Sequence, residues 1–270
     1  MGYNTLFVIL HNFLINIHII TWGTEKYTKH ELLSHGLQAF TFSTNESMLG
    51  AFWFVPMFLF ATAMFVVLFA LAQRCKYSLA IHGMILFLTA GVGLYTTKVG
   101  MNLNYHLQIS FLSVPIIYLG YFTKCYWETI KKYFTVFSAV ICGGIVYYIL
   151  LQGVGCIDLS VNAIINPILF YPITILGICF VISMAKFLDK FQYSRKVFSY
   201  IGKDSFHIMA LHFFAFKFVD CIYGNYKGYN YVVFEKFPHA FSYTGVYLMV
   251  GIGLPLGLVW ILRKTNKILK

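Results

Sequence analysis

The segment from Leu49 to Ala72 reads LGAFWFVPMFLFATAMFVVLFALA and contains no charged residue. A helix needs about 20 consecutive apolar residues to cross the hydrocarbon core of a bilayer. The composition of the whole chain points the same way, because 59% of its 270 residues are hydrophobic and only 11% are charged. A soluble domain carries roughly 25% charged residues. We therefore expect an integral membrane protein whose main solvent is lipid.

Eight stretches of the chain are long and apolar enough to cross a membrane. Because backbone groups find no water partners inside a bilayer, each stretch is expected to be a helix. The expected spans are residues 3–22, 49–72, 78–97, 107–122, 133–152, 163–185, 199–219 and 241–262. The sequence thus predicts an all-α, polytopic membrane helical bundle of about eight transmembrane helices, built as a single domain over residues 1–270.

Basic residues gather in alternate loops between these spans, while the loops at residues 98–106 and 153–162 carry few of them. Cationic loops stay in the cytoplasm, so both termini are expected there. The same distribution explains the formal charge of +11 without a nucleic-acid partner, and none is expected. The basic residues of the expected cytoplasmic segments are Arg74, Lys76, Lys124, Lys131, Lys132, Lys186, Lys190, Arg195, Lys196, Arg263, Lys264, Lys267 and Lys270.

Polar side chains inside apolar spans are costly and mark candidate functional sites. Asn4, His11 and His18 follow one another at a spacing of seven residues in the first span. Seven residues are nearly two helical turns, so the three side chains share a face. This face is interpreted either as one wall of a polar pocket or as a surface for hydrogen bonds between helices.

The seventh span is the most polar one and contains IGKDSFHIMALHF at residues 201–213. Ser205 and His212 are seven residues apart and share a face, and His212 is expected near the middle of the membrane. A histidine at that depth suits either a structural hydrogen bond or proton transfer. Trp53 opens the second span, where an interfacial anchor is the simplest interpretation.

The chain lacks the motifs of soluble enzymes: it contains no G-x-S-x-G, no Walker loop, no H-E-x-x-H and no Rossmann glycine pattern. Its six cysteines form no C-x-x-C pair, which disfavours a zinc or redox motif. No metal site is expected.

Two segments together resemble the acyltransferase 3 family. Residues 52–59, FWFVPMFL, are similar to the family's "WFLPALF" segment. Residues 201–212, IGKDSFHIMALH, are similar to its late "IGKNSLYIMALH" segment and especially to the fucose 4-O-acetylase-like branch. Residues 114–121 and 166–178 resemble the family's "LPFYLLGY" and "NP..F…LGI" spans. The matching segments follow the family's order over nearly the whole chain.

The resemblance implies a membrane-bound O-acyltransferase, with acetyl transfer as the expected reaction, in a bacterial cytoplasmic membrane. Such an enzyme moves an acyl group from acyl-CoA, here acetyl-CoA, to a sugar hydroxyl of a cell-surface polysaccharide or its lipid-linked precursor. A histidine takes the proton of the hydroxyl, which attacks the thioester. The pocket candidates are Trp53, Ser205, His212, His11 and His18. The candidates for binding the CoA phosphates are Arg74, Lys76, Lys131 and Lys132, and topology alone also explains these four cations.

The chain departs from the family at its beginning. The family starts with a helix that carries a basic residue and then the catalytic histidine, in a pattern like "D.LKG.A...VV.GH", followed by "F.LSGY"; this sequence has neither. Residues 1–22 resemble the family's third span, so the chain resembles a member without the first two helices. The catalytic residue is therefore unassigned. Two alternatives remain, a non-catalytic relative and a transporter or flippase for a lipid-linked sugar; transporters often contain inverted repeats, and the sequence shows none.

Overall fold

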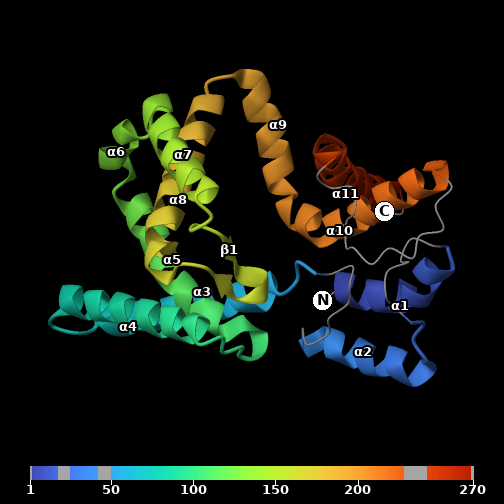
Figure 1. Cartoon of the computed structure of the whole chain (residues 1–270), viewed down its shortest axis with the longest axis horizontal. Helices are drawn as coiled ribbons and strands as arrows, with labels where there is room; N and C mark the ends of the chain where they lie inside the picture. The colour runs from blue at the N-terminus through green and yellow to red at the C-terminus, as the bar shows by residue number, and fades with distance from the viewer. Residues whose placement is uncertain (1, 18–24, 42–49, 228–241, 269–270) are drawn as a thin grey trace. The chain divides into compact units, whose positions relative to one another are not determined.

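The computed structural model describes residues 2–17, 25–41, 50–227 and 242–268 (Figure 1). It divides into two compact units. The central unit is Trp53–Lys196. The terminal unit combines Met1–Phe52 with Val197–Lys270, so it brings together the two ends of the sequence.

The central unit consists of helices with short connections. Helices α3, α4 and α5 pack against one another, and α7 packs along α8 (Figure 1). The helices are α3 (Phe54–Gln73), α4 (Ser78–Lys98), α5 (Leu107–Cys125), α6 (Trp127–Ile130), α7 (Val136–Leu151), α8 (Phe170–Leu188) and the start of α9 (Gln192–Lys203). Short 3-10 turns are η2 (Asn104–His106), η3 (Lys131–Tyr133), η4 (Leu159–Val161) and η5 (Pro167–Leu169), and a small antiparallel hairpin pairs β1 (Ile157–Asp158) with β2 (Ala163–Ile164).

The core of the central unit lies where α3, α5 and α8 meet. Met57, Ile109, Leu112 and Phe170 are buried there. The hydroxyl of Ser110 donates a hydrogen bond to the carbonyl of Met57 at 2.9 Å and so fixes α5 against α3. Small and hydroxyl-bearing residues at such contacts are typical of helix packing in membranes, because they allow close approach and supply bonds between helices.

A proline in α5 is accommodated next to a contact with α8. Pro115 has no backbone N–H and therefore removes one hydrogen bond from the helix. The hydroxyl of Tyr171, in α8, donates to the carbonyl of Leu112 at 3.2 Å, within the same turn of α5. This bond ties the two helices together at the point where α5 is weakened.

The terminal unit contains two helix pairs, α1 with α2 and α10 with α11. Asn12 of α1 holds the segment before α2, because its side chain bonds both the N–H and the carbonyl of Tyr27, at 2.7 and 2.8 Å. In the other pair, Gly251 of α11 lies against the ring of Phe216. The helices are α1 (Gly2–Asn16), α2 (Lys29–Thr41), α10 (Ser205–Lys227) and α11 (Thr244–Ile268).

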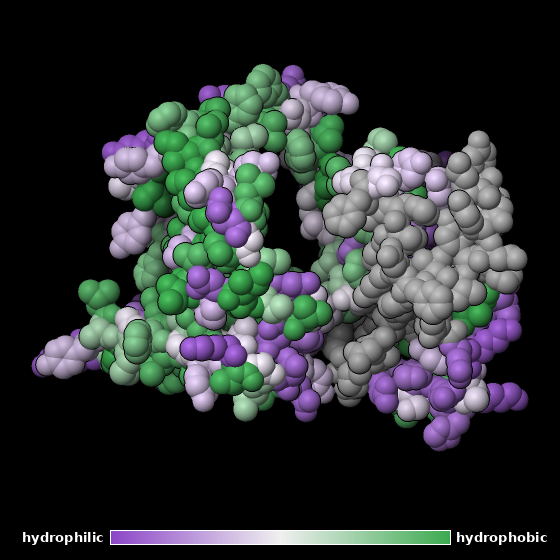
Figure 2. Space-filling view, in the orientation of Figure 1, coloured by the Kyte–Doolittle hydropathy of each residue, from purple (hydrophilic) through white to green (hydrophobic). Residues whose placement is uncertain are grey.

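Five of the described helical segments are long and apolar enough to cross a membrane, and a sixth is added if the bent pair of Trp127–Tyr133 and Val136–Leu151 forms one span. The five are Phe54–Gln73, Ser78–Lys98, Pro167–Leu188, Ser205–Tyr223 and Thr244–Thr265. Their outward side chains are largely apolar, and Figure 2 shows mostly hydrophobic residues over α7 and α8. An all-α membrane protein is thus confirmed, while the count of eight spans stays a prediction.

Several expected span boundaries are wrong. The expected helix at residues 163–185 begins only at Pro167, because residues 163 and 164 form β2. Asn166 accepts a hydrogen bond from the N–H of Ile168, and proline is favoured directly after such a cap. The expected span at residues 199–219 is divided at Asp204, where α9 ends and α10 begins. The first expected span includes residues 18–22, which lie outside the described residues.

Candidate functional site

The loop between α4 and α5 has an unusual backbone. Tyr105 and His106 have φ angles of 59° and 55°, and Asn162, in the loop before β2, has a φ of 56°. These are the positive-φ residues other than glycine in the described part of the chain. Each such position costs on the order of 1 kcal/mol, and strain of this kind gathers at functional sites.

His106 lies beside Trp53, the residue that precedes α3. The centres of the two rings are 5.3 Å apart. Burial lowers the pKa of His106, which keeps the imidazole neutral at neutral pH. Its Nδ1 is buried and has no hydrogen-bond partner among the residues that the structure describes. A neutral imidazole has one donor and one acceptor nitrogen, so this ring can accept a proton from a bound hydroxyl.

Two buried amides hold the backbone that leads to His106. Gln108 accepts a hydrogen bond from the N–H of Leu103 at 3.0 Å through its Oε1. Asn162 donates from Nδ2 to the carbonyl of Met101 at 3.2 Å and to Oδ1 of Asn102 at 3.1 Å. Both amides therefore hold residues 101–103 in place by hydrogen bonds. We call Trp53, His106, Gln108 and Asn162 the His106 cluster.

Each amide of the cluster also has an unused polar atom. Within the described residues, Nε2 of Gln108 and Oδ1 of Asn162 are buried without a partner. Buried polar groups are nearly always hydrogen-bonded, and an unsatisfied one costs about 1–3 kcal/mol. With Nδ1 of His106, three buried polar atoms of the cluster therefore have no hydrogen-bond partner among the described residues.

Sequence analysis identified Trp53 but missed the other three residues of the cluster. The run NLNYH at residues 102–106 carries the available signal. Asn and His are enriched in left-handed backbone conformations, so a short polar run between two spans favours a tight, side-chain-rich turn. The partner from residue 162 comes from a distant loop and has no local signature.

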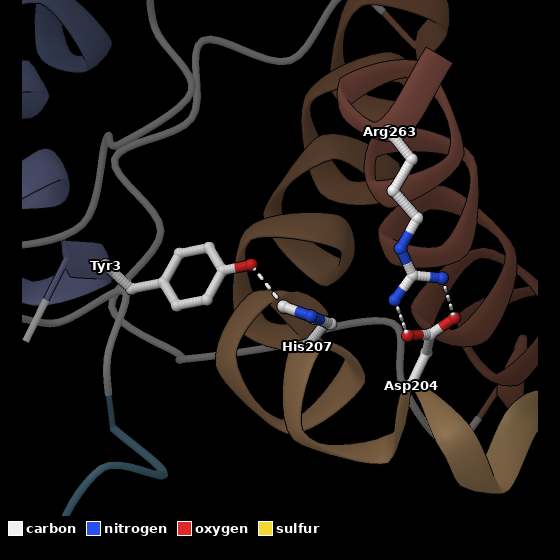
Figure 3. Close-up of polar contacts among 4 residues, drawn as sticks. All are labelled: Tyr3, Asp204, His207 and Arg263. Carbon is white, nitrogen blue, oxygen red and sulfur yellow. Dashed lines mark hydrogen bonds and ion pairs between the residues drawn. The ribbon is translucent and has the colours of Figure 1, made fainter. Parts of the chain in front are cut away.

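A second polar group lies at the start of α10 in the terminal unit (Figure 3). The guanidinium of Arg263 donates two hydrogen bonds to the carboxylate of Asp204, at 2.6 and 2.9 Å. These bonds hold the pKa of Asp204 below its usual value. The hydroxyl of Tyr3 lies 2.6 Å from Nδ1 of His207. None of these four was among the sequence-predicted pocket residues.

The predicted histidines of the terminal unit make structural contacts. His11 is fully buried, and its ring stacks on Tyr27 with centres 3.6 Å apart. His212 donates from Nδ1 to the carbonyls of its own helix, with 2.8 Å to Met209. Its ring packs against neighbouring phenylalanines. Ser205 is exposed, and His18 lies outside the described residues.

The four predicted phosphate-binding cations fall in two different loops of the central unit. Arg74 and Lys76 are exposed in the turn between α3 and α4, without a carboxylate partner among the described residues. Lys131 forms an ion pair with Glu128, and Lys132 lies over the ring of Tyr133 at 5.1 Å. Lys76 likewise lies over a ring, that of Tyr77, at 5.8 Å. Of the four cations, Lys131 is the one whose charge is paired with a carboxylate among the described residues.

No family model, curated protein or solved structure matches the chain.

Proposed function

We propose that the chain is a membrane-bound O-acyltransferase. It transfers an acetyl group from acetyl-CoA, or another acyl group from its acyl-CoA, to a sugar hydroxyl of a cell-surface polysaccharide or its lipid-linked precursor. The observation that carries this proposal is the His106 cluster, where a histidine with a lowered pKa lies beside an indole and two buried amides hold the loop that leads to it. The resemblance of residues 52–59 and 201–212 to the acyltransferase 3 family adds support.

A sugar hydroxyl matches the chemistry of the unused atoms of the cluster, because it is both a donor and an acceptor. These atoms are buried, so the loop must open to admit it. Its oxygen can accept from Nε2 of Gln108 while its proton points to Nδ1 of His106. A neighbouring hydroxyl can donate to Oδ1 of Asn162. The indole of Trp53 offers an apolar face to the C–H side of the sugar ring.

The chemical step follows from these positions. His106 takes the hydroxyl proton as the sugar oxygen attacks the thioester carbonyl, and the C–S bond then breaks. The CoA thiolate leaves and takes the proton from the imidazolium, so the products are the sugar ester and free CoA thiol. A positioned general base contributes about 10²- to 10⁴-fold to the rate of such a step.

The donor is proposed to bind at Arg74 and Lys76, whose charges suit the phosphates of acyl-CoA. With both termini in the cytoplasm of a bacterial cell, the positive-inside rule puts this turn on the cytoplasmic side. The turn and the His106 cluster lie at opposite ends of α4, a helix about 30 Å long. The bound acyl-CoA must therefore extend its thioester along the bundle from this turn to the cluster, so donor binding and hydroxyl activation need separate tests.

The test uses the full chain in proteoliposomes with radiolabelled acetyl-CoA and glycan extracted from cell membranes. We expect alkali-labile label on the glycan, an increased KM for acetyl-CoA in R74Q/K76Q, and at least a 100-fold loss of kcat in H106Q. The matched control is H82Q, because His82 is a buried histidine that bonds Tyr118 instead. Glycan that crosses the bilayer without label indicates a transporter, and glycan that neither moves nor takes label indicates a non-catalytic relative. Equal rates for H106Q and wild type remove His106 as the base.

A further inference from the structure

Helix α9 (Gln192–Lys203) has two chemically different faces. At 100° per residue, Tyr193, Val197 and Tyr200 point to one side of the helix. Lys196 and Lys203 are seven residues apart and lie together at one edge of that side, next to the polar side that carries Arg195 and Ser199. A helix with an aromatic and aliphatic side bordered by basic residues is typical of the membrane–water interface.

The apolar face of α9 is not used for packing inside the protein. In α9, all of whose residues are described, no residue is buried. Tyr193, Phe198 and Tyr200 remain 81%, 55% and 48% exposed. Apolar rings left outside the core of a membrane protein require another apolar environment, and the bilayer supplies one.

The chain on both sides of α9 fixes the depth of the helix. It follows the span Pro167–Leu188 and precedes the span Ser205–Tyr223. Its 12 residues make a helix about 18 Å long, too short to cross the hydrocarbon core of about 30 Å. The helix therefore lies at the leaflet where one span ends and the next begins.

The two carboxylates next to α9 are already occupied by arginines. Arg195 binds Asp189, with 2.8 Å between Nε and the carboxylate. Arg263 binds Asp204 with both ends of its guanidinium. Among the described residues, Lys196 and Lys203 consequently form no ion pair. The charge of Lys203 helps to lower the pKa of Asp204, and neither lysine is held in a direct ion pair that would keep it from an anion outside the chain.

We propose that α9 binds the anionic phospholipids of its leaflet, with the two lysines on the lipid phosphates and the apolar face among the acyl chains. Lysines near an anionic membrane surface each strengthen binding by about fivefold. An acidic protein would match the positive charge of the two lysines, but it would leave the apolar face of α9 without an apolar environment. This inference does not depend on the proposed acyltransferase function.

The test compares hydrogen–deuterium exchange of the full chain in nanodiscs of phosphatidylcholine alone and of phosphatidylcholine with 30% phosphatidylglycerol. We expect the α9 amides to exchange at least tenfold more slowly in the anionic discs, while the amides of α3 exchange equally in both. The variant K196Q/K203Q should lose most of this difference. K124Q/K132Q is the matched control, because it removes the same net charge from another basic loop and should retain the difference.

Three outcomes would overturn the proposal. The first is equal α9 exchange of the wild-type chain in the two kinds of disc, a comparison that needs no variant. The second is full protection in K196Q/K203Q, because the two lysines would then have no role. The third is an equal loss in both double variants, because the effect would then follow net charge and not α9.

Discussion

Asp204 and Arg263 join the start of α10 to the end of α11 by two parallel hydrogen bonds of 2.6 and 2.9 Å (Figure 3). The Asp204 side chain is 2% exposed, although it lies between two helices that are rich in exposed residues. A paired guanidinium and carboxylate fix both distance and orientation. The bond therefore ties the residue between α9 and α10 to α11.

We expect D204N to lower the Tm of the detergent-solubilised protein by several degrees, because a side chain that is 2% exposed then loses its charge-assisted hydrogen bonds to Arg263. The folded-state pKa of Asp204 is lowered, so its contribution is present above the unfolded pKa of about 3.9 and is lost as the pH falls through the folded value. The difference in Tm between wild type and D204N should hence shrink in acid below about pH 4. D189N is the matched control, since the Asp189–Arg195 pair is exposed and its loss should change Tm little. Equal effects of the two variants would contradict the assignment.

The two asparagines on either side of β2, Asn162 and Asn166, should respond differently to the same substitution. Asn162 uses its Nδ2 as a donor to Met101 and Asn102, so N162D should destabilise the protein by about 1–3 kcal/mol. Asn166 uses its side chain only as an acceptor for the N–H of Ile168, and a carboxylate serves equally well at that cap. N166D should therefore be neutral. Thermal unfolding followed by size-exclusion chromatography measures both, and equal stabilities would show that the amide of Asn162 is not needed as a donor.

The close approach of α4 and α5 predicts opposite effects for two glycines in one helix. A Cβ at Gly93 would lie 2.7 Å from the side chain and 2.8 Å from the backbone nitrogen of Leu112. G93A should hence cost about 1–3 kcal/mol, because the helices must separate. At Gly91 a Cβ meets open space, and G91A should be neutral or stabilise the helix by up to about 1 kcal/mol. The same unfolding assay compares them; a tolerated G93A would mean that α4 and α5 are not in close contact.

Composition and charge were enough to predict the class of the protein, because lipid as solvent requires long apolar helices. The spans around α3, α4, α8 and α11 were accordingly found within a few residues. Their ends were harder to predict, because they depend on caps and ion pairs. Asn166 begins η5 by binding a backbone N–H, and Asp204, bound to Arg263, lies where the seventh expected span is divided. Neither interaction changes hydropathy, so a search for apolar stretches cannot detect it.

The candidate site was predicted less well than the fold. The spacing of polar residues within spans indicated His11 and His212 as pocket residues. In the structure, His11 stacks on Tyr27 and His212 bonds a carbonyl of its own helix. The His106 cluster depends instead on loops that meet only after folding, and its strained backbone leaves no periodic pattern. Trp53 was found because a tryptophan at a span end is notable by itself.

A last prediction concerns the pH dependence of acyl transfer, and it rests on the proposed function. Burial lowers the pKa of His106, so the fraction of neutral base should already be high below pH 6.5. We expect kcat/KM for the glycan to rise with pH through a single pKa below 6.5 and to be level from there to pH 8. Initial rates with radiolabelled acetyl-CoA between pH 4.5 and 8 give the profile, with the Tm measured at each pH to separate inactivation from titration. The residual activity of H106Q should lack this inflection, and H82Q should keep it. An inflection that persists in H106Q would assign the titrating base to another residue.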